Sequence, residues 1–112
     1  MVDLDGILAA LAEPTRRHVV ELLRDGPRRA GELAEASDLS AAAMSRHLRV
    51  LRSCGLVEEA RSEADARVRL YRLRRAPFEG LQAWLEELEG LWSEQLGAFK
   101  AHVESRPRRS RR

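Results

Sequence analysis

The chain has 112 residues, of which 44% are hydrophobic and 34% charged, a balance typical of one globular soluble domain. No apolar run approaches the roughly 20 residues that a membrane-spanning helix needs, so we expect no membrane segment. A single cysteine, Cys54, excludes an internal disulfide, and no Cys or His cluster has metal-ligand spacing, which predicts no metal site and no cofactor. The acidic N-terminal residues lack the cationic segment of a secretory signal and favour a cytoplasmic protein.

The net charge of +2 conceals a strong segregation of charge along the chain. Residues 14–75 carry fourteen arginines against nine acidic residues, whereas residues 76–105 carry six glutamates against one lysine. A basic central block is the electrostatic footprint of a nucleic-acid surface, but charge alone is weak evidence, because most charge clusters are simply solvated surface faces.

Three short helices are expected in the first third of the chain. Residues 3–12 place apolar side chains at helical spacing, and Pro14 suits the first turn of a second helix that ends at Gly26. Residues 32–37 form a third, brief helix, and residues 38–39 are only a tight connection to the next one.

A fourth helix is predicted over residues 40–53. Ser40 is a favourable N-cap, and Gly55 ends the helix. On a helical wheel Met44, Leu48 and Leu51 share one side, so this side is expected to pack on the domain. The opposite side is small, polar and cationic.

That outward side has the composition of a helix that enters the major groove. Small residues permit close approach to base edges, Arg46 can donate bidentately to guanine, and Arg49 is expected to reach a phosphate. For His47, a packed histidine that bonds the backbone competes with a DNA contact. The DNA-binding residues predicted on this helix are Ser40, Ala42, Ala43, Ser45, Arg46, His47 and Arg49.

A β-hairpin follows the fourth helix. Residues 56–57 and the alternating residues 68–73 are expected to form its strands, with residues 61–67 at the tip. Arg61, Arg67 and Arg69 lie near this tip, where they are predicted to contact the DNA backbone or minor groove.

The last predicted element is one long helix from Phe78 onward, with a continuous apolar stripe. Trp84 and Trp92 lie near the same face, and such a stripe on an acidic helix favours a homodimer, with intrachain packing as the alternative. Pro107 closes the helix, and residues 106–112 are expected to form a basic disordered tail. The predicted dimer-interface residues are Leu4, Ile7, Leu8, Leu11, Trp84, Leu88, Leu91, Trp92 and Phe99.

The expected fold is therefore mostly α with a small β-hairpin, a winged helix-turn-helix of about five helices and a two- to three-stranded wing. Residues 1–105 are expected to form a single domain with dimerisation helices at both ends.

Four segments in order resemble the ArsR/SmtB family of bacterial repressors. They are Leu-Ala-Glu-Pro-Thr-Arg-Arg at residues 11–17, Gly-Glu-Leu-Ala at 31–34, Met-Ser-Arg-His-Leu-Arg-Val-Leu at 44–51 and Gly-Leu-Val at 55–57. The resemblance implies a homodimer that binds double-stranded DNA at an inverted repeat and that an inducer releases.

Two departures from the family pattern matter. Asp65-Ala66 replaces the usual wing glycine, so the tip is expected to be longer or differently bent, and residues 32–37 lack the Cys-x-Cys pair of metal-sensing members. The chain resembles the non-metal-sensing branch with paired tryptophans in its last helix. A small-molecule effector at the dimer interface and the absence of any effector are both open.

Other classes of function have less support in the sequence. The sequence has no Ser/His/Asp or Cys/His set in a catalytic motif and no glycine-rich phosphate-binding loop, so we expect that the protein is not an enzyme. A protein-interaction module on a winged fold remains the alternative to a sequence-specific DNA-binding regulator, most simply a dimeric repressor of its own or adjacent genes.

Overall fold

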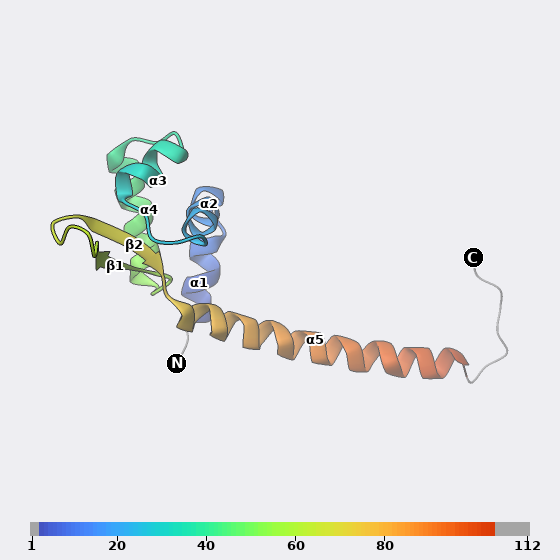
Figure 1. Ribbon diagram of the computed structural model, residues 1–112. Helices are drawn as coiled ribbons and strands as arrows, with labels where there is room; N and C mark the ends of the chain where they lie inside the picture. Colours follow the sequence, from blue (N-terminus) through green and yellow to red (C-terminus); the bar gives the residue numbers. More distant parts are fainter. Residues whose placement is uncertain (1–2, 105–112) are drawn as a thin grey trace. The chain divides into compact units, whose positions relative to one another are not determined.

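The computed structural model describes residues 3–104 and divides the chain into two units, Met1–Gly80 and Leu81–Arg112, each of which is described by itself. The expected class of fold, helices with a small antiparallel hairpin, is confirmed (Figure 1). In chain order the elements are α1 (Leu4–Leu11), α2 (Pro14–Leu23), α3 (Ala30–Ala36), α4 (Ala41–Ser53), β1 (Val57–Arg61), β2 (Arg69–Leu73) and α5 (Arg75–Glu104).

The core of the first unit lies where α1 to α4 meet the base of the hairpin. α4 packs against α2, α3 and β1, and so occupies the middle of this unit. The largest fully buried side chains of this core are Ile7, Val19, Leu33, Met44, Leu48, Leu51, Leu56 and Val57. Burying these apolar side chains is the main source of the stability of the first unit.

The helix ends follow local capping rules. Asp3 accepts a hydrogen bond from the backbone N–H of Gly6 at 3.0 Å and so caps α1. α3 begins at Ala30, two residues before the predicted start, because the Glu32 carboxylate accepts from the backbone N–H of Arg29 at 2.9 Å and caps the earlier turn. Asp38, with φ of 56°, makes the sharp left-handed turn between α3 and α4.

β1 and β2 form a two-stranded antiparallel sheet in which Val57 pairs with Leu73 and Arg61 with Arg69. The backbone of Arg28 adds one isolated bridge to Tyr71. The Arg28 N–H donates to the carbonyl oxygen of Tyr71 with an N···O distance of 3.0 Å, and the Tyr71 N–H donates to that of Arg28 at 2.8 Å. The wing therefore has two strands and a single bridging residue, and this bridge ties the hairpin to the segment between α2 and α3.

α5 is a helix of 30 residues that begins at Arg75, three residues before the predicted Phe78. Pro77 falls within its first turn, where a missing N–H removes no intrahelical hydrogen bond, so the proline does not delay the helix. At 1.5 Å per residue α5 is about 45 Å long. Pro107 and the predicted tail at 106–112 lie outside the described residues.

None of the helices in residues 3–104 combines the length and the apolarity that crossing a membrane requires.

Candidate nucleic-acid interface

The orientation of α4 is set at its start and along its inner side. The Ser40 hydroxyl accepts a hydrogen bond from the backbone N–H of Ala43 at 3.1 Å, which caps the helix as predicted. Met44, Leu48 and Leu51 are buried in the core. The packed side fixes the rotation of α4, so the opposite side must face away from the core.

This outward side of α4 carries small residues and unpaired cations. Ala42, Ser45, Arg46 and Arg49 are exposed, and Ala43 is half-buried. Within residues 3–104, the guanidinium groups of Arg46 and Arg49 have no carboxylate or hydrogen-bonding partner. An unpaired guanidinium beside small side chains can approach a guanine edge or a phosphate without first breaking an ion pair.

His47 differs from its neighbours because its side chain is half-buried. Arg16 Nη1 lies 3.4 Å from His47 Nδ1, and Arg16 Nε donates to the carbonyl oxygen of Ala10 at 2.7 Å. His47 is thus tied to the junction of α1 and α2. Of the two roles that the sequence leaves open for His47, this contact supports the packed one.

The same junction explains the Glu-Pro-Thr-Arg-Arg segment, to which the sequence gives no individual roles. The Glu13 carboxylate accepts from the backbone N–H of Arg16 at 3.0 Å, and this bond is the main reason why the pKa of Glu13 lies below its ordinary value. Arg17 Nη1 donates to the carbonyl oxygens of Leu11 and Ala12, at 2.7 and 3.1 Å. Arg16 and Arg17 therefore satisfy carbonyl groups at the end of α1.

The hairpin places two arginines directly opposite each other. Arg61 and Arg69 are paired across the strands, and both side chains are exposed. Like charges at directly opposed positions of an antiparallel pair are destabilising. The Glu59 carboxylate lies 3.7 Å from Arg69 Nε and offsets part of this repulsion, whereas Arg61 has no carboxylate partner among the described residues.

Arg67 is held by a neighbour at the wing tip. Its Nε and Nη2 atoms each lie 3.2 Å from an oxygen of Asp65, and its backbone N–H donates to the same carboxylate at 3.0 Å. These hydrogen bonds lower the pKa of Asp65, and those from the Arg67 guanidinium have the largest effect. The Asp65-Ala66 departure thus produces a turn braced by Asp65, in which the exposed Arg67 guanidinium is held by a neighbouring carboxylate.

One acidic residue that the sequence pattern does not single out lies between α4 and the wing. The Glu59 carboxylate lies 2.7 Å from Arg52 Nη1 and 3.7 Å from Arg69 Nε. The Tyr71 hydroxyl donates to the same carboxylate at 3.5 Å. These groups line a polar hollow of about 180 Å³ together with Ser45 and Arg49.

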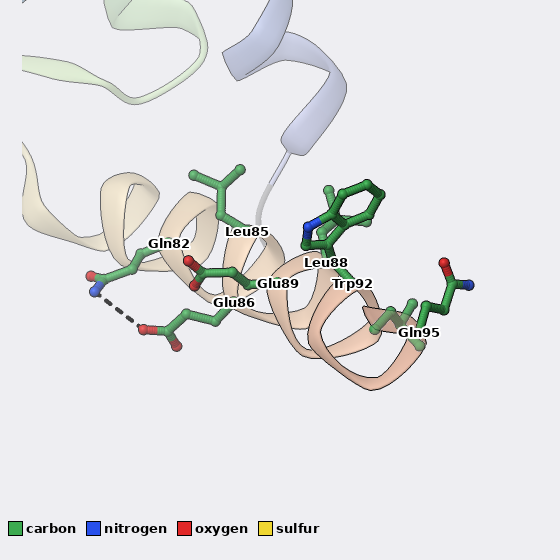
Figure 2. A pocket seen from close by; sticks show the side chains of 8 residues that line it. Gln82, Leu85, Glu86, Leu88, Glu89, Trp92 and Gln95 are labelled. Carbon is green, nitrogen blue, oxygen red and sulfur yellow. Dashed lines mark hydrogen bonds between the residues drawn. The ribbon is translucent and has the colours of Figure 1, made fainter. Parts of the chain in front are cut away.

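A second surface lies on α5, within the unit Leu81–Arg112. Trp92 is 63% exposed and Leu88 45% exposed, and Leu91 is also open to solvent, whereas Trp84 is half-buried. Leu88, Leu91 and Trp92, but not Trp84, line a hollow of about 790 Å³. Figure 2 shows Leu88 and Trp92 in this hollow together with Gln82, whose amide donates to Glu86 at 3.3 Å. Every lining residue belongs to one helix, so the hollow lacks an opposite wall.

The other predicted dimer residues fall in different places. Leu8 is 40% exposed, and Leu4 and Leu11 are half-buried. Ile7 is 1% exposed, which corrects its place among the interface residues, because its side chain is in the core of the first unit and offers no surface to a partner. The side chain of Phe99 lies outside the described part of the chain.

No group of three or more His, Cys, Asp or Glu residues in the described part of the chain is arranged to hold a metal ion. Cys54 is a free, half-buried thiol whose sulfur lies 3.4 Å from the carbonyl oxygen of Leu51.

Known proteins share this fold and its sequence pattern. Residues 13–59 match the bacterial regulatory proteins of the arsR family. The chain is 38% identical to the HTH-type transcriptional regulator Rv2034 of Mycobacterium tuberculosis (strain ATCC 25618 / H37Rv) over 96 residues. This match covers 86% of this chain and 84% of that protein. The chain is also 31% identical to the transcriptional repressor SdpR of Bacillus subtilis (strain 168) over 58 residues, a match that covers 52% of this chain and 64% of that protein.

Among solved structures, the ArsR-like transcriptional regulator from Rhodococcus sp. RHA1 superposes with a TM-score of 0.74 at 31% identity, over 92% of this chain and 94% of that one. Sequence and fold therefore agree over most of the chain. It belongs to the ArsR family of bacterial DNA-binding transcriptional regulators.

Proposed function

We propose that this regulator is a homodimeric repressor of its own or adjacent genes, and that each copy inserts residues 40–53 into the major groove of one half of an inverted-repeat operator. The outward side of α4 carries the proposal, because Arg46 and Arg49 are exposed and unpaired beside Ala42 and Ser45. The name of the related repressor SdpR supports repression as the direction of control.

The arginines divide into two roles. Arg46 lies in the N-terminal half of α4, nearest the small residues, and is assigned to a base edge. Arg49 follows one turn later and is assigned to a phosphate. In the wing, Arg61 is assigned to the flanking backbone or minor groove, because it is exposed, lies opposite Arg69 across the strands and has no carboxylate partner among the described residues.

The open apolar side of α5 supports self-association. A helix gains most of its stability from packing, and a run of large apolar side chains exposed by about half on one helix is unfavourable without a cover. A second copy of α5 would supply the missing wall of the hollow around Leu88 and Trp92. The exposed Leu8 of α1 is assigned to pairing as well, since it also leaves apolar surface open to solvent.

Charge also favours this use of α5 over a DNA contact. Its exposed glutamates, Glu86, Glu87, Glu89 and Glu94, would repel phosphates. We therefore assign DNA binding to residues 1–80 and pairing chiefly to α5, within one functional domain over residues 1–105. A protein with this role acts on DNA in the cytoplasm and needs no catalytic group; an apolar effector, if bound, would occupy the hollow at the dimer interface.

The test is fluorescence anisotropy with the duplex upstream of the protein's own gene and with a shuffled duplex of equal length, over a salt series. Arg46→Ala should cost about 1–3 kcal/mol on the upstream duplex and much less on the shuffled one, because only a base contact carries sequence information. Arg24→Ala is the matched control, since Arg24 is an exposed arginine at the end of α2, outside α4 and the wing.

Equal losses on both duplexes for Arg46→Ala would rule out base reading by Arg46. Wild-type binding that is salt-sensitive but shows no preference between the duplexes would contradict an operator at that position.

A further inference from the structure

Glu59 joins the two parts of the surface that the proposed function assigns to DNA. Its carboxylate lies 2.7 Å from Arg52 on α4 and 3.7 Å from Arg69 on the wing. Arg52 and Arg69 are therefore paired, whereas Arg46, Arg49 and Arg61 have no carboxylate partner among the described residues. The five arginines near this surface are not equivalent donors to phosphate.

The position of Glu59 is fixed through Tyr71 on the neighbouring strand. Glu59 pairs with Tyr71 across the strands, and the Tyr71 hydroxyl donates to its carboxylate at 3.5 Å. The backbone of Tyr71 is in turn held by two hydrogen bonds to Arg28. The Glu59 side chain is 27% exposed, so bulk salt screens its ion pairs less than it screens an open surface pair.

From this geometry we infer that Glu59 is a specificity-determining positioning residue, which holds Arg52 and Arg69 away from the DNA backbone and limits how many phosphates the surface neutralises. This inference rests on the proposed use of α4 and the wing. A phosphate that contacts Arg52 meets a guanidinium whose Nη1 already lies 2.7 Å from a carboxylate, so it must either break this ion pair or approach the negative charge of Glu59. Both effects weaken contacts that carry no sequence information, while Arg46 remains free to contact a base.

The chain contains a matched control on the opposite face of the same strand. Glu58 lies 2.8 Å from Arg72 and 3.6 Å from Arg74, so it also holds two arginines. Its side chain is 40% exposed. Glu58→Gln and Glu59→Gln therefore change the net charge equally and release the same number of arginines, but only Glu59→Gln releases them beside the outward side of α4.

The experiment measures the affinity of the full chain for a shuffled duplex as a function of salt concentration, for wild type, E59Q and E58Q. Each added phosphate contact steepens the slope of log K against log salt by about 0.9. E59Q should therefore steepen the slope by about one to two, and each additional phosphate contact should tighten binding about eightfold at about 0.1 M salt. E58Q should leave the slope within about 0.3 of the wild-type slope.

A second pair of variants tests the same inference without changing Glu59. R49Q removes an unpaired arginine and should make the slope shallower by about 0.9, whereas R52Q removes a paired one and should change it by less than half as much. Circular dichroism and thermal melting of each variant verify that the fold is retained.

The role of Glu59 is overturned if E59Q and E58Q change the slope equally, or if R52Q and R49Q do. Failure of the proposed function gives a different result, because R49Q and Arg46→Ala would then leave DNA binding unchanged. In that case α4 is not the DNA-binding surface, and the assignment to Glu59 fails with it.

Discussion

Glu13 shows how one side chain connects the sequence motif to stability. Its carboxylate caps α2, and the hydrogen bond from the Arg16 amide holds its pKa below the ordinary value of a glutamate. A carboxyl group whose pKa is lowered on folding stabilises the folded state above its unfolded pKa. That contribution is lost as the pH falls through the folded pKa, when the carboxylate is protonated and the cap weakens.

We therefore expect the free energy of unfolding to decrease as the pH is lowered from about 5 to about 3, with Asp65 contributing in the same direction. Glu13→Gln should be less stable than wild type at pH 7 and should show a weaker pH dependence. Urea unfolding at several pH values measures both effects. Glu63→Gln, which changes an exposed carboxylate with no hydrogen bond in the described chain, should retain the wild-type dependence; identical curves for all three proteins would contradict the role of Glu13.

His47 and Glu59 mark the limit of sequence reasoning at the scale of single residues. The helical period separates Arg46 from Leu48 without knowledge of the fold, and both positions are as predicted. The contact of His47 with Arg16 joins residues 31 positions apart. The contact of Glu59 with Arg52 depends on how closely β1 approaches α4, and nothing in the local pattern specifies that distance.

At the scale of elements, α4 has one buried side and one open side, and mutations on the two sides should lower the free energy of unfolding by different amounts. Leu48 is 2% exposed and Val50 is 38% exposed. Leu48→Ala should lower the free energy of unfolding by about 2–5 kcal/mol, because it removes buried methyl groups and leaves a cavity. Val50→Ala, two residues along the same helix, should change it by less than about 1 kcal/mol.

Chemical denaturation of both variants provides this comparison. Similar losses for Leu48→Ala and Val50→Ala would mean that α4 is not packed through the side that holds Met44 and Leu51.

Element boundaries could be predicted where a local signal is strong and not elsewhere. Ser40 before three alanines specifies the start of α4, and the structure agrees. α3 starts earlier than predicted because a Glu32 carboxylate substitutes for a standard N-cap residue. α5 starts earlier than predicted because Pro77 fits within its first turn. A proline alone does not show whether a helix includes it in the first turn or begins after it.

At the scale of the whole molecule, the proposed dimer depends on the apolar side of α5. Replacing Trp92 and Leu88 together by alanine should raise the dimer dissociation constant by about 30-fold or more, because large side chains at the centre of an interface contribute about 2 kcal/mol or more. Analytical ultracentrifugation measures the change. Trp92 is 63% exposed in the single chain, so its loss should leave the protomer folded.

Glu87→Ala on the same helix is the control and should leave the dissociation constant nearly unchanged, since Glu87 does not line the hollow. The double variant should also lose operator affinity, because two linked half-site contacts reinforce each other. A dimer that is unchanged by the double variant would exclude this side of α5 as the interface.

The open side of α5 also affects how a cell would respond to the amount of this protein. If two copies must meet before α5 is covered, the concentration of the DNA-binding form varies with the square of the protomer concentration below the dissociation constant. Halving synthesis would then reduce operator occupancy about fourfold at low occupancy. A gene controlled by its own product in this way would be released abruptly as cell growth dilutes the protein, without any inducer.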